Sequence, residues 1–237
     1  KLVNPKGVPP FYGQFRDTVM TKVSEYTWIP KPGAQQLVHK ILQPAIRFEK
    51  RQCIDLPPVT FVDRDVPMTA QQMGYYKLLK SQMLIEADGE EISAVNAAVK
   101  VSKLLQIACG SVYTDTGEVL DFDVSNRLST VVEVIEEASH KVLIFAPFRH
   151  TIQLLHAYLT KAGVVCECIH GDVPVHARTN IFKRFQEDNN SLKVLIIQPQ
   201  AAAHGVTLTA ADTIIRYAPV TSTETYLQAN ARIDRPG

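Results

Sequence analysis

Hydrophobic and polar positions follow one pattern from about residue 126 to the end of the chain and a different one before it. After residue 126, short apolar runs alternate with stretches whose apolar residues recur at helical spacing. Continuous apolar runs are typical of strands that are covered on both faces. The pattern predicts four strands, at residues 142–146, 164–169, 194–197 and 213–217. Because these strands alternate with helices, we expect an α/β fold with a parallel sheet.

The first 125 residues read as a helical, loop-rich region that leads into this α/β domain of residues 126–237. Helical spacing predicts helices at residues 11–21, 34–42, 70–86 and 93–108. Two capping boxes are expected, one from Thr69 to Gln72 and one from Thr221 to Glu224, which should open the last helix. Residues 115–117 are typical of a hairpin turn, and the acidic residues 86–91 are expected to form a solvated loop.

Composition limits the possible functions without choosing one. Of the 237 residues, 46% are hydrophobic and 21% charged, which is typical of a globular protein. No run approaches the roughly 20 apolar residues of a membrane span, and residues 1–6 lack the apolar core of a signal peptide. The four cysteines show no framework spacing, so we expect a cytoplasmic protein. A net charge of +1 does not by itself indicate nucleic-acid binding.

The motifs by which parallel-sheet enzymes usually bind phosphate are absent from the sequence. None of the eleven glycines is followed by lysine, so there is no phosphate loop. No Gly-x-Gly-x-x-Gly fingerprint and no Asp-Glu pair at a strand end is present either. The sequence therefore predicts the scaffold of a nucleotide enzyme without its phosphate cradle.

Cys166, Cys168 and His170 would share one face of a strand, which is a possible start of a metal site. A structural zinc site needs four ligands, usually two separated pairs, and no second pair exists. Free cysteine behaves as a small buried hydrophobe, so we expect core packing and no metal.

Near the end of the chain, Gln228, Arg232 and Arg235 stand at i, i+4 and i+7 and would align on one helix face. Two guanidinium groups on one stripe suit phosphate oxygens. On spacing alone, a solvated basic face is the more common explanation. Pro236 should end or kink the helix near Arg235.

Four segments in the second half, in the right order, resemble motifs of the second RecA-like lobe of superfamily 2 helicases, particularly Swi/Snf-type DNA translocases. Residues 141–148 are similar to the fourth motif, and residues 205–213 to the fifth. The other matches are residues 170–172 followed by Arg178 and Phe185, and a sixth motif made of Gln228, Ala229, Arg232, Arg235 and Gly237. The resemblance implies a RecA-like sheet with helices on both faces.

The first half resembles the same family as a connector between two lobes. Residues 42–48 and 53–58 are similar to its entry, and residues 104–109 to a leucine-rich helix further along. In the family this region follows the third motif. The resemblance therefore implies that the phosphate loop and the Asp-Glu motif belong to an N-terminal RecA-like lobe preceding Lys1, and that this chain alone is inactive.

The resemblance also implies residue roles in an ATP hydrolase that uses Mg²⁺. Arg232 and Arg235 would be arginine fingers, and Gln228 would bind the γ-phosphate or the attacking water. Gly205 and Asp212 would lie at the nucleotide, although a loop glycine and a turn aspartate are the simpler explanations. Contacts to the DNA backbone, expected to be double-stranded and read with little sequence specificity, would come from Arg149, His150, Gln200 and Thr207.

Some positions depart from the family's pattern. Residues 198–200 are Gln-Pro-Gln where Ser-Thr-Lys is usual, and Thr207 stands where asparagine is common. These departures suggest a divergent branch like the phage and bacterial members, which would work in a host cytoplasm. A non-catalytic nucleic-acid or protein-binding module on the same scaffold stays an alternative. A Rossmann-like transferase is disfavoured, because residues 147–150 offer no glycine-rich turn.

Overall fold

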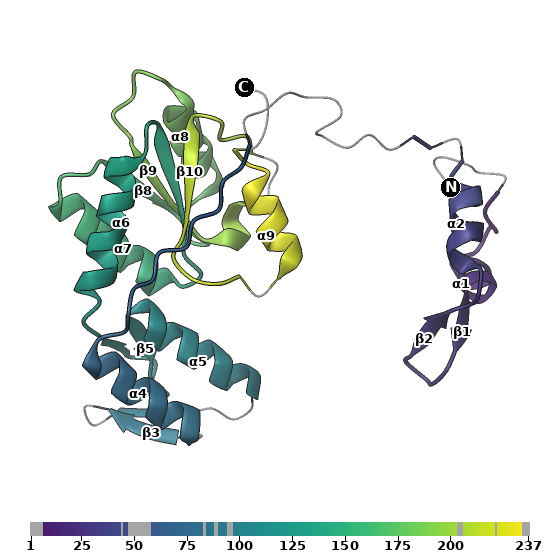
Figure 1. Cartoon of the computed structure of the whole chain (residues 1–237), viewed down its shortest axis with the longest axis horizontal. Helices are drawn as coiled ribbons and strands as arrows, with labels where there is room; N and C mark the ends of the chain where they lie inside the picture. Colours follow the sequence, from purple (N-terminus) through teal and green to yellow (C-terminus); the bar gives the residue numbers. More distant parts are fainter. Residues whose placement is uncertain are drawn as a thin grey trace. The chain divides into compact units, whose positions relative to one another are not determined.

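The computed structural model describes residues 7–43, 45–46, 58–82, 84–87, 90–93, 97–202, 206–220 and 222–233. Contacts divide the chain into two compact units, Lys1–Asp55 and Leu56–Gly237 (Figure 1). No helix in the described ranges is long and apolar enough to cross a membrane.

The described part of the smaller unit contains two helices and a hairpin. Helix α1 (Tyr12–Val19) runs directly into β1 (Met20–Lys22), which pairs antiparallel with β2 (Trp28–Pro30), and α2 (Ala34–Leu42) follows. The helix predicted over residues 11–21 therefore ends earlier than expected. Met20, its C-cap, has an extended backbone (φ −126°, ψ 152°), so the chain leaves the helix there and pairs as a strand.

A four-stranded parallel sheet forms the centre of the larger unit. Its order is β10 (Ala211–Arg216), β7 (Lys141–Phe145), β9 (Val194–Ile197), β8 (Cys166–Ile169), and each neighbouring pair is parallel. The predicted parallel sheet is confirmed. The α/β fold class follows directly from the apolar runs of the sequence.

Helices cover both faces of the sheet because alternate strand residues point to opposite sides. Val142, Ile144 and their neighbours pack with α6 (Ser125–Glu137) and α7 (Arg149–Lys161) in one core. Leu143 and Phe145 pack on the other side with α8 (Val175–Gln186) and with Ala229 of α9 (Thr223–Asn230). Figure 1 shows α6 and α7 on one side of the sheet and α9 on the other.

A third, smaller core joins the elements that precede α6 in this unit. It contains Leu79, Ile107, Val112 and Phe122. The elements around it are α4 (Ala70–Ser81), β3 (Leu84–Ala87), β4 (Glu90–Ser93), α5 (Ala97–Cys109), β5 (Ser111–Tyr113) and β6 (Val119–Asp121). The Thr69–Gln72 capping box is present at the start of α4, and β5 and β6 pair across the predicted hairpin turn.

Further predictions at element ends were wrong. The helix expected over residues 70–86 stops at Ser81, because Gln82 is extended (φ −120°, ψ 164°). Part of the acidic stretch expected to be a loop is then paired, since β3 and β4 form an antiparallel hairpin. The last helix begins one residue later than its predicted capping box: Ser222 is the N-cap, and its hydroxyl accepts a hydrogen bond from the Thr225 N–H at 3.3 Å.

Candidate nucleotide and DNA site

Gln198, directly after β9, links three loops at the carboxyl edge of the sheet. Its backbone N–H donates to the Ile169 carbonyl at 2.8 Å. Its side-chain Nε2 donates to the Pro147 carbonyl at 3.3 Å, and its Oε1 accepts from the Gly171 N–H at 3.4 Å. The side chain of Gln198 thus connects the turn after β7 and the turn after β8 to the end of β9.

Arg149 and His150, the first two residues of α7, each face a carboxylate. Arg149 forms an ion pair with Asp172, and both side chains are about half exposed. His150 Nε2 lies 2.7 Å from Oδ1 of Asp121, at the end of β6. An exposed pair such as Arg149 and Asp172 contributes little to stability. The structure brings these two predicted DNA contacts together, each with an acidic neighbour.

Arg178 fixes the loop that carries Asp172. Its Nε donates to the Val173 carbonyl at 2.6 Å, and its Nη2 donates to the Gly171 carbonyl at 2.8 Å. The sequence comparison placed Arg178 in a family motif, but no role was predicted for it. These two hydrogen bonds show it to be a residue that shapes the loop after β8.

Arg232 joins the sixth-motif segment to the fifth-motif segment. Its Nη1 donates to the Val206 carbonyl at 3.3 Å, and its own carbonyl accepts from the Leu208 N–H at 2.9 Å. The residue is 4% exposed. Thr207, between the two contacted residues, is exposed. Two segments that are 24 residues or more apart in the chain are therefore held side by side at this arginine.

Arg216, near the end of β10, anchors the helix that precedes Arg232. Its guanidinium carbon lies 3.9 Å from the centre of the Tyr226 ring, and it contacts Oδ1 of Asn230. Burial lowers the pKa of Arg216 from its ordinary value. Sequence reasoning missed this residue. The signal available was an arginine directly after Ile214 and Ile215 at the end of a strand, where a partly buried cation needs partners.

The remaining predicted residues are placed as follows. Gln228 is exposed on α9, and its Nε2 donates to Glu224 at 3.0 Å. Gln200 is exposed in the 3-10 helix η1 (Pro199–Ala202), which α9 contacts. Gly205 and Arg235 lie outside the described residues.

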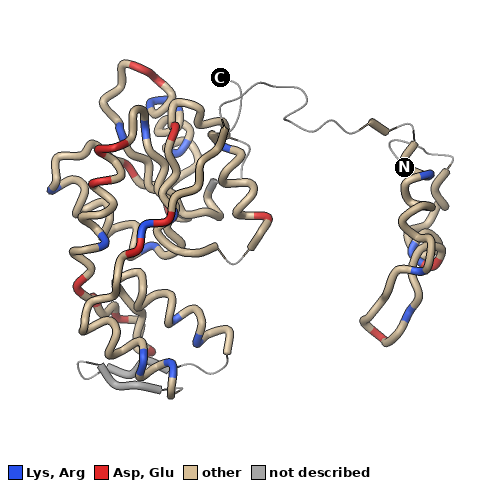
Figure 2. The backbone as a smooth tube through the Cα atoms, viewed as in Figure 1, with Lys and Arg blue, Asp and Glu red and all other residues tan. Residues whose placement is uncertain are grey.

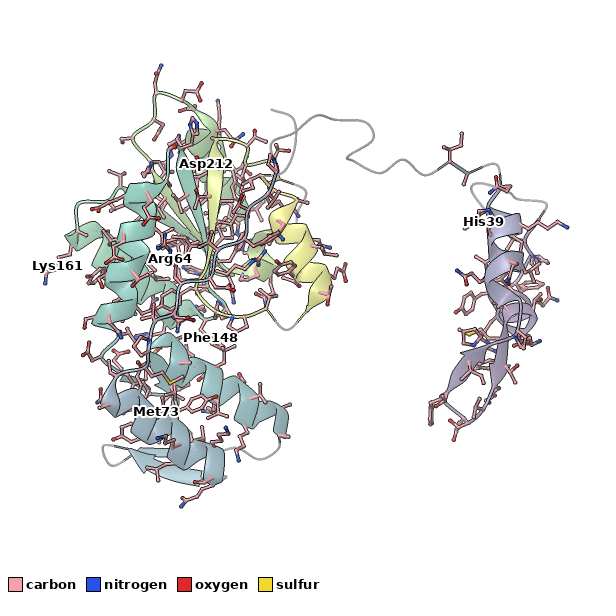
Figure 3. The ribbon with its side chains drawn as sticks, viewed as in Figure 1. His39, Arg64, Met73, Phe148, Lys161 and Asp212 are labelled. Atoms are coloured by element: carbon pink, nitrogen blue, oxygen red, sulfur yellow. The ribbon has the colours of Figure 1, made fainter. Side chains whose placement is uncertain are left out.

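Asp212 is not brought to the carboxyl edge of the sheet. It lies at the amino end of β10, where its Oδ2 accepts from the His140 N–H at 3.1 Å and its Oδ1 accepts from the Thr213 hydroxyl at 2.8 Å. Figure 3 shows Asp212 and Phe148, the N-cap of α7, at opposite ends of the sheet. The contacts of Asp212 are those of a residue that ties the start of β7 to β10.

The Cys166, Cys168 and His170 trio does not converge on a metal. Both cysteines pack with the core under α6 and α7. Burial raises the pKa of the Cys166 thiol and raises that of Cys168 to about 12, so both are neutral thiols near pH 7. Within the described ranges, no group of three or more His, Cys, Asp and Glu side chains is arranged to hold a metal ion.

Residues 126–237 thus contain a parallel sheet covered on both faces, with the buried Arg232 of the predicted sixth motif against the predicted fifth-motif segment. The family described as "Helicase conserved C-terminal domain" matches residues 126–237. The resemblance of these residues to a Snf2-type superfamily 2 C-terminal lobe is thereby confirmed.

Curated relatives align over most of the chain. The chain is 27% identical over 218 residues to the "CHD3-type chromatin-remodeling factor PICKLE" of Arabidopsis thaliana, covering 84% of this chain and 16% of that protein. It is 26% identical over 235 residues to the "Chromodomain-helicase-DNA-binding protein 1-like" of Mus musculus, covering 94% and 26%. A solved structure, the Sulfolobus solfataricus SWI2/SNF2 ATPase C-terminal domain, matches at 22% identity with a TM-score of 0.49. The match covers 63% of this chain and 68% of that one. A likeness this weak adds nothing to the comparison.

Two consequences follow from these relatives. The chain spans only 16% and 26% of the length of the two curated proteins, so the activity of a whole protein stays a proposal. Both come from eukaryotes and are chromatin-remodelling or chromodomain proteins by name. The expected phage-like or bacterial branch therefore finds no support.

Proposed function

We propose that this chain is the second lobe, with its connector, of an ATP-driven DNA translocase whose first lobe is an N-terminal RecA-like domain carrying the phosphate loop. ATP and Mg²⁺ bind between the two lobes, and Arg232 and Arg235 reach the γ-phosphate from this side. The observation that carries the proposal is the double hydrogen bond between Arg232 and the segment containing Val206 and Leu208.

The surroundings of Arg232 suit an arginine finger. A guanidinium that is 4% exposed acts in a low-dielectric environment, where a cation stabilises developing negative charge far more than in water. Its carbonyl partner at Val206 holds one nitrogen and fixes the direction of the group. Gln228 orients the attacking water or the γ-phosphate. Gly205 allows the backbone to approach the nucleotide. Asp212 has the turn-residue role that its contact with His140 supports.

Movement of the lobe would follow the state of the nucleotide. Arg216 attaches α9 to β10, and Arg232 attaches the end of α9 to the segment before β10. A displacement of Arg232 on binding the γ-phosphate is therefore transmitted to the whole sheet. Closing and opening of the cleft between the lobes then moves the protein along DNA. Arg149, His150, Gln200 and Thr207 contact the backbone of duplex DNA, and the first two exchange Asp172 and Asp121 for phosphate.

The test is Arg232→Lys in a protein that carries both lobes. Lysine keeps the charge but loses the planar fork, so we expect ATP binding to persist while DNA-stimulated turnover falls by about 10³-fold or more. Arg184→Lys is the matched control, because Arg184 forms an exposed pair with Glu167 on the lobe and should leave turnover unchanged. Equal ATPase activity in the Arg232 variant and the parent would favour the alternative of a non-catalytic binding module.

Two further measurements serve as controls for the Arg232→Lys experiment. The melting temperature of the 237-residue chain with Arg232→Lys separates a catalytic effect from unfolding, since Arg232 is buried. The unaltered chain should show no ATP turnover, because its sequence contains no phosphate loop. Turnover by the purified chain alone would contradict the two-lobe proposal.

A further inference from the structure

The two units of the chain carry opposite formal charges. Residues 1–55 contain nine of the 25 Lys and Arg residues but only four of the 24 Asp and Glu residues, which gives +5. Residues 56–237 contain the other 16 basic and 20 acidic residues, which gives −4. The near-neutral total conceals this separation. Attraction for a polyanion is therefore concentrated in the smaller unit, and Figure 2 colours the charged residues of its described part.

Two cations of the smaller unit, Arg16 and Lys22, lie near the ring of Trp28, the only tryptophan of the chain, and Lys31 lies at the base of the same hairpin with its Nζ donating to the Asp17 carbonyl. The guanidinium carbon of Arg16 lies 3.7 Å from the centre of the Trp28 ring, and Nζ of Lys22 lies 6.0 Å from it. Lys31 donates from its backbone N–H to the Val19 carbonyl at 2.9 Å, which places it at the base of the same hairpin. We call Arg16, Lys22, Trp28 and Lys31 the Trp28 cluster. Asp17, which pairs with Arg16 at 3.4 Å, is its acidic neighbour.

Aromatic side chains stand exposed on the same unit. Tyr26, in the turn between β1 and β2, is 88% exposed, and Phe11 and Tyr12 at the start of α1 are 68% and 77% exposed. In the described part of this unit, Val19 and Ala34 are the buried hydrophobic residues. Exposed aromatic rings beside a basic surface are the combination by which proteins bind single-stranded nucleic acid: bases stack on the rings while cations follow the phosphates.

We propose that α1 and the β1–β2 hairpin form a binding surface for single-stranded DNA. Tyr26 stacks on an unpaired base, and Lys22 and Lys31 of the Trp28 cluster contact phosphates. A protein partner would also cover exposed rings, but the +5 charge of the unit favours a polyanion. The surface adds to the proposed function, which concerns duplex DNA on the larger unit, and it does not depend on Arg232.

The experiment uses the whole 237-residue chain and oligo-dT, with Trp28 emission as the readout. Because Trp28 is the only tryptophan, a saturable change in emission reports binding at the hairpin itself. Phosphate contacts by Lys22 and Lys31 give a slope of log K against log salt of roughly −1.4, at about 0.7 per contact for single strands. Lys22→Gln should reduce that slope by about 0.7. Tyr26→Ser should weaken binding about five- to hundredfold, and Tyr26→Phe should retain it.

Lys161→Gln is the control for charge, because Lys161 is exposed at the end of α7 in the larger unit (Figure 3) and should leave oligo-dT binding unchanged. Far-ultraviolet circular dichroism checks that each hairpin variant is folded. Equal binding by Tyr26→Ser and the parent would overturn the proposal, as would a duplex that binds the hairpin as tightly as the single strand. Binding seen by anisotropy of labelled DNA without any change at Trp28 would also overturn it. None of these results affects the Arg232 test, which reads ATP turnover.

Discussion

The guanidinium carbon of Arg127 lies 4.3 Å from the centre of the Tyr217 ring, and the same side chain contacts two distant backbone carbonyls. Its Nη1 donates to Ala108, in the last turn of α5, at 2.5 Å, and its Nη2 donates to Tyr217, directly after β10. Helix α5 belongs to the small third core, and β10 belongs to the parallel sheet. Arg127 thus fastens the region before α6 to the lobe at one point.

Replacing Arg127 by lysine should destabilise the larger unit. Lysine reaches at most one of the two carbonyls and loses the stacking on Tyr217, so a carbonyl is left without its donor. We expect a loss of about 1–3 kcal/mol in the free energy of unfolding, measured by urea denaturation of the whole chain. Arg184→Lys, at an exposed pair, should change it by less than about 0.5 kcal/mol. Equal stability of both variants would show that Arg127 does not fasten the two cores.

Removing the Tyr217 hydroxyl should not destabilise the larger unit, in contrast to replacing Arg127. Tyr217 is 2% exposed, and in the described part of the structure its hydroxyl has no hydrogen-bond partner. Burial also raises the pKa of this phenol well above its ordinary value. Because an unsatisfied buried hydroxyl costs free energy, Tyr217→Phe should be neutral or stabilising by up to about 2 kcal/mol in the same urea experiment. A clear loss of stability would mean that the hydroxyl has a partner in solution.

The hydrophobic pattern predicted the parallel sheet because its strands are buried and are therefore made mostly of apolar residues. Val194–Ile197 of β9 is buried at every position, so its apolar run is visible in the sequence. The hairpins β1–β2 and β3–β4 were missed for the opposite reason. Each has strands of three or four residues that are held by cross-strand pairing, and such short strands leave no side-chain pattern to read.

The site was predictable in its residue types but not in its contacts. Helical spacing identified Arg232, yet its bond to Val206 depends on how α9 returns across the sheet, which no local pattern encodes. Arg216 and Gln198 were missed because their partners lie on other elements. The carboxylates beside Arg149 and His150 were missed for the same reason, although they alter how those residues meet DNA.

Removing the charge of Asp172 should strengthen duplex binding if Arg149 contacts the DNA backbone. Asp172→Asn removes the ion pair, so Arg149 becomes available to a phosphate and an acidic repulsion is lost. Exposed pairs are weak, so we expect affinity to rise by up to about fivefold. The slope of log K against log salt should steepen by about 0.9. Fluorescence anisotropy of a labelled duplex, in a Tyr26→Ser background, measures both quantities on the larger unit.

Glu167→Gln is the matched control for this prediction. Glu167 pairs with Arg184 in the same kind of exposed contact, but on β8 and α8, away from the loops that Gln198 links. It loses the same charge, so a general change in net charge would affect both variants equally. An equal rise in affinity for the two variants would remove Arg149 from the proposed DNA contacts.

Alkaline pH should weaken the larger unit through its buried thiols. Burial raises the pKa of Cys109 to about 11 and that of Cys168 to about 12, against 9.0 for an unperturbed thiol. A raised pKa in the folded state means that the stabilising contribution is fully present below pH 9 and is lost as pH rises from 9 towards 11 or 12. At pH 10.5 each thiol should contribute a loss of about 2 kcal/mol relative to pH 8. Urea denaturation at the two pH values measures this loss, and Cys109→Ala and Cys168→Ala should each reduce it, whatever their own stability at pH 8. A loss of the same size in the parent and both variants would assign the alkaline sensitivity to another group with a raised pKa, such as the buried Tyr217 phenol.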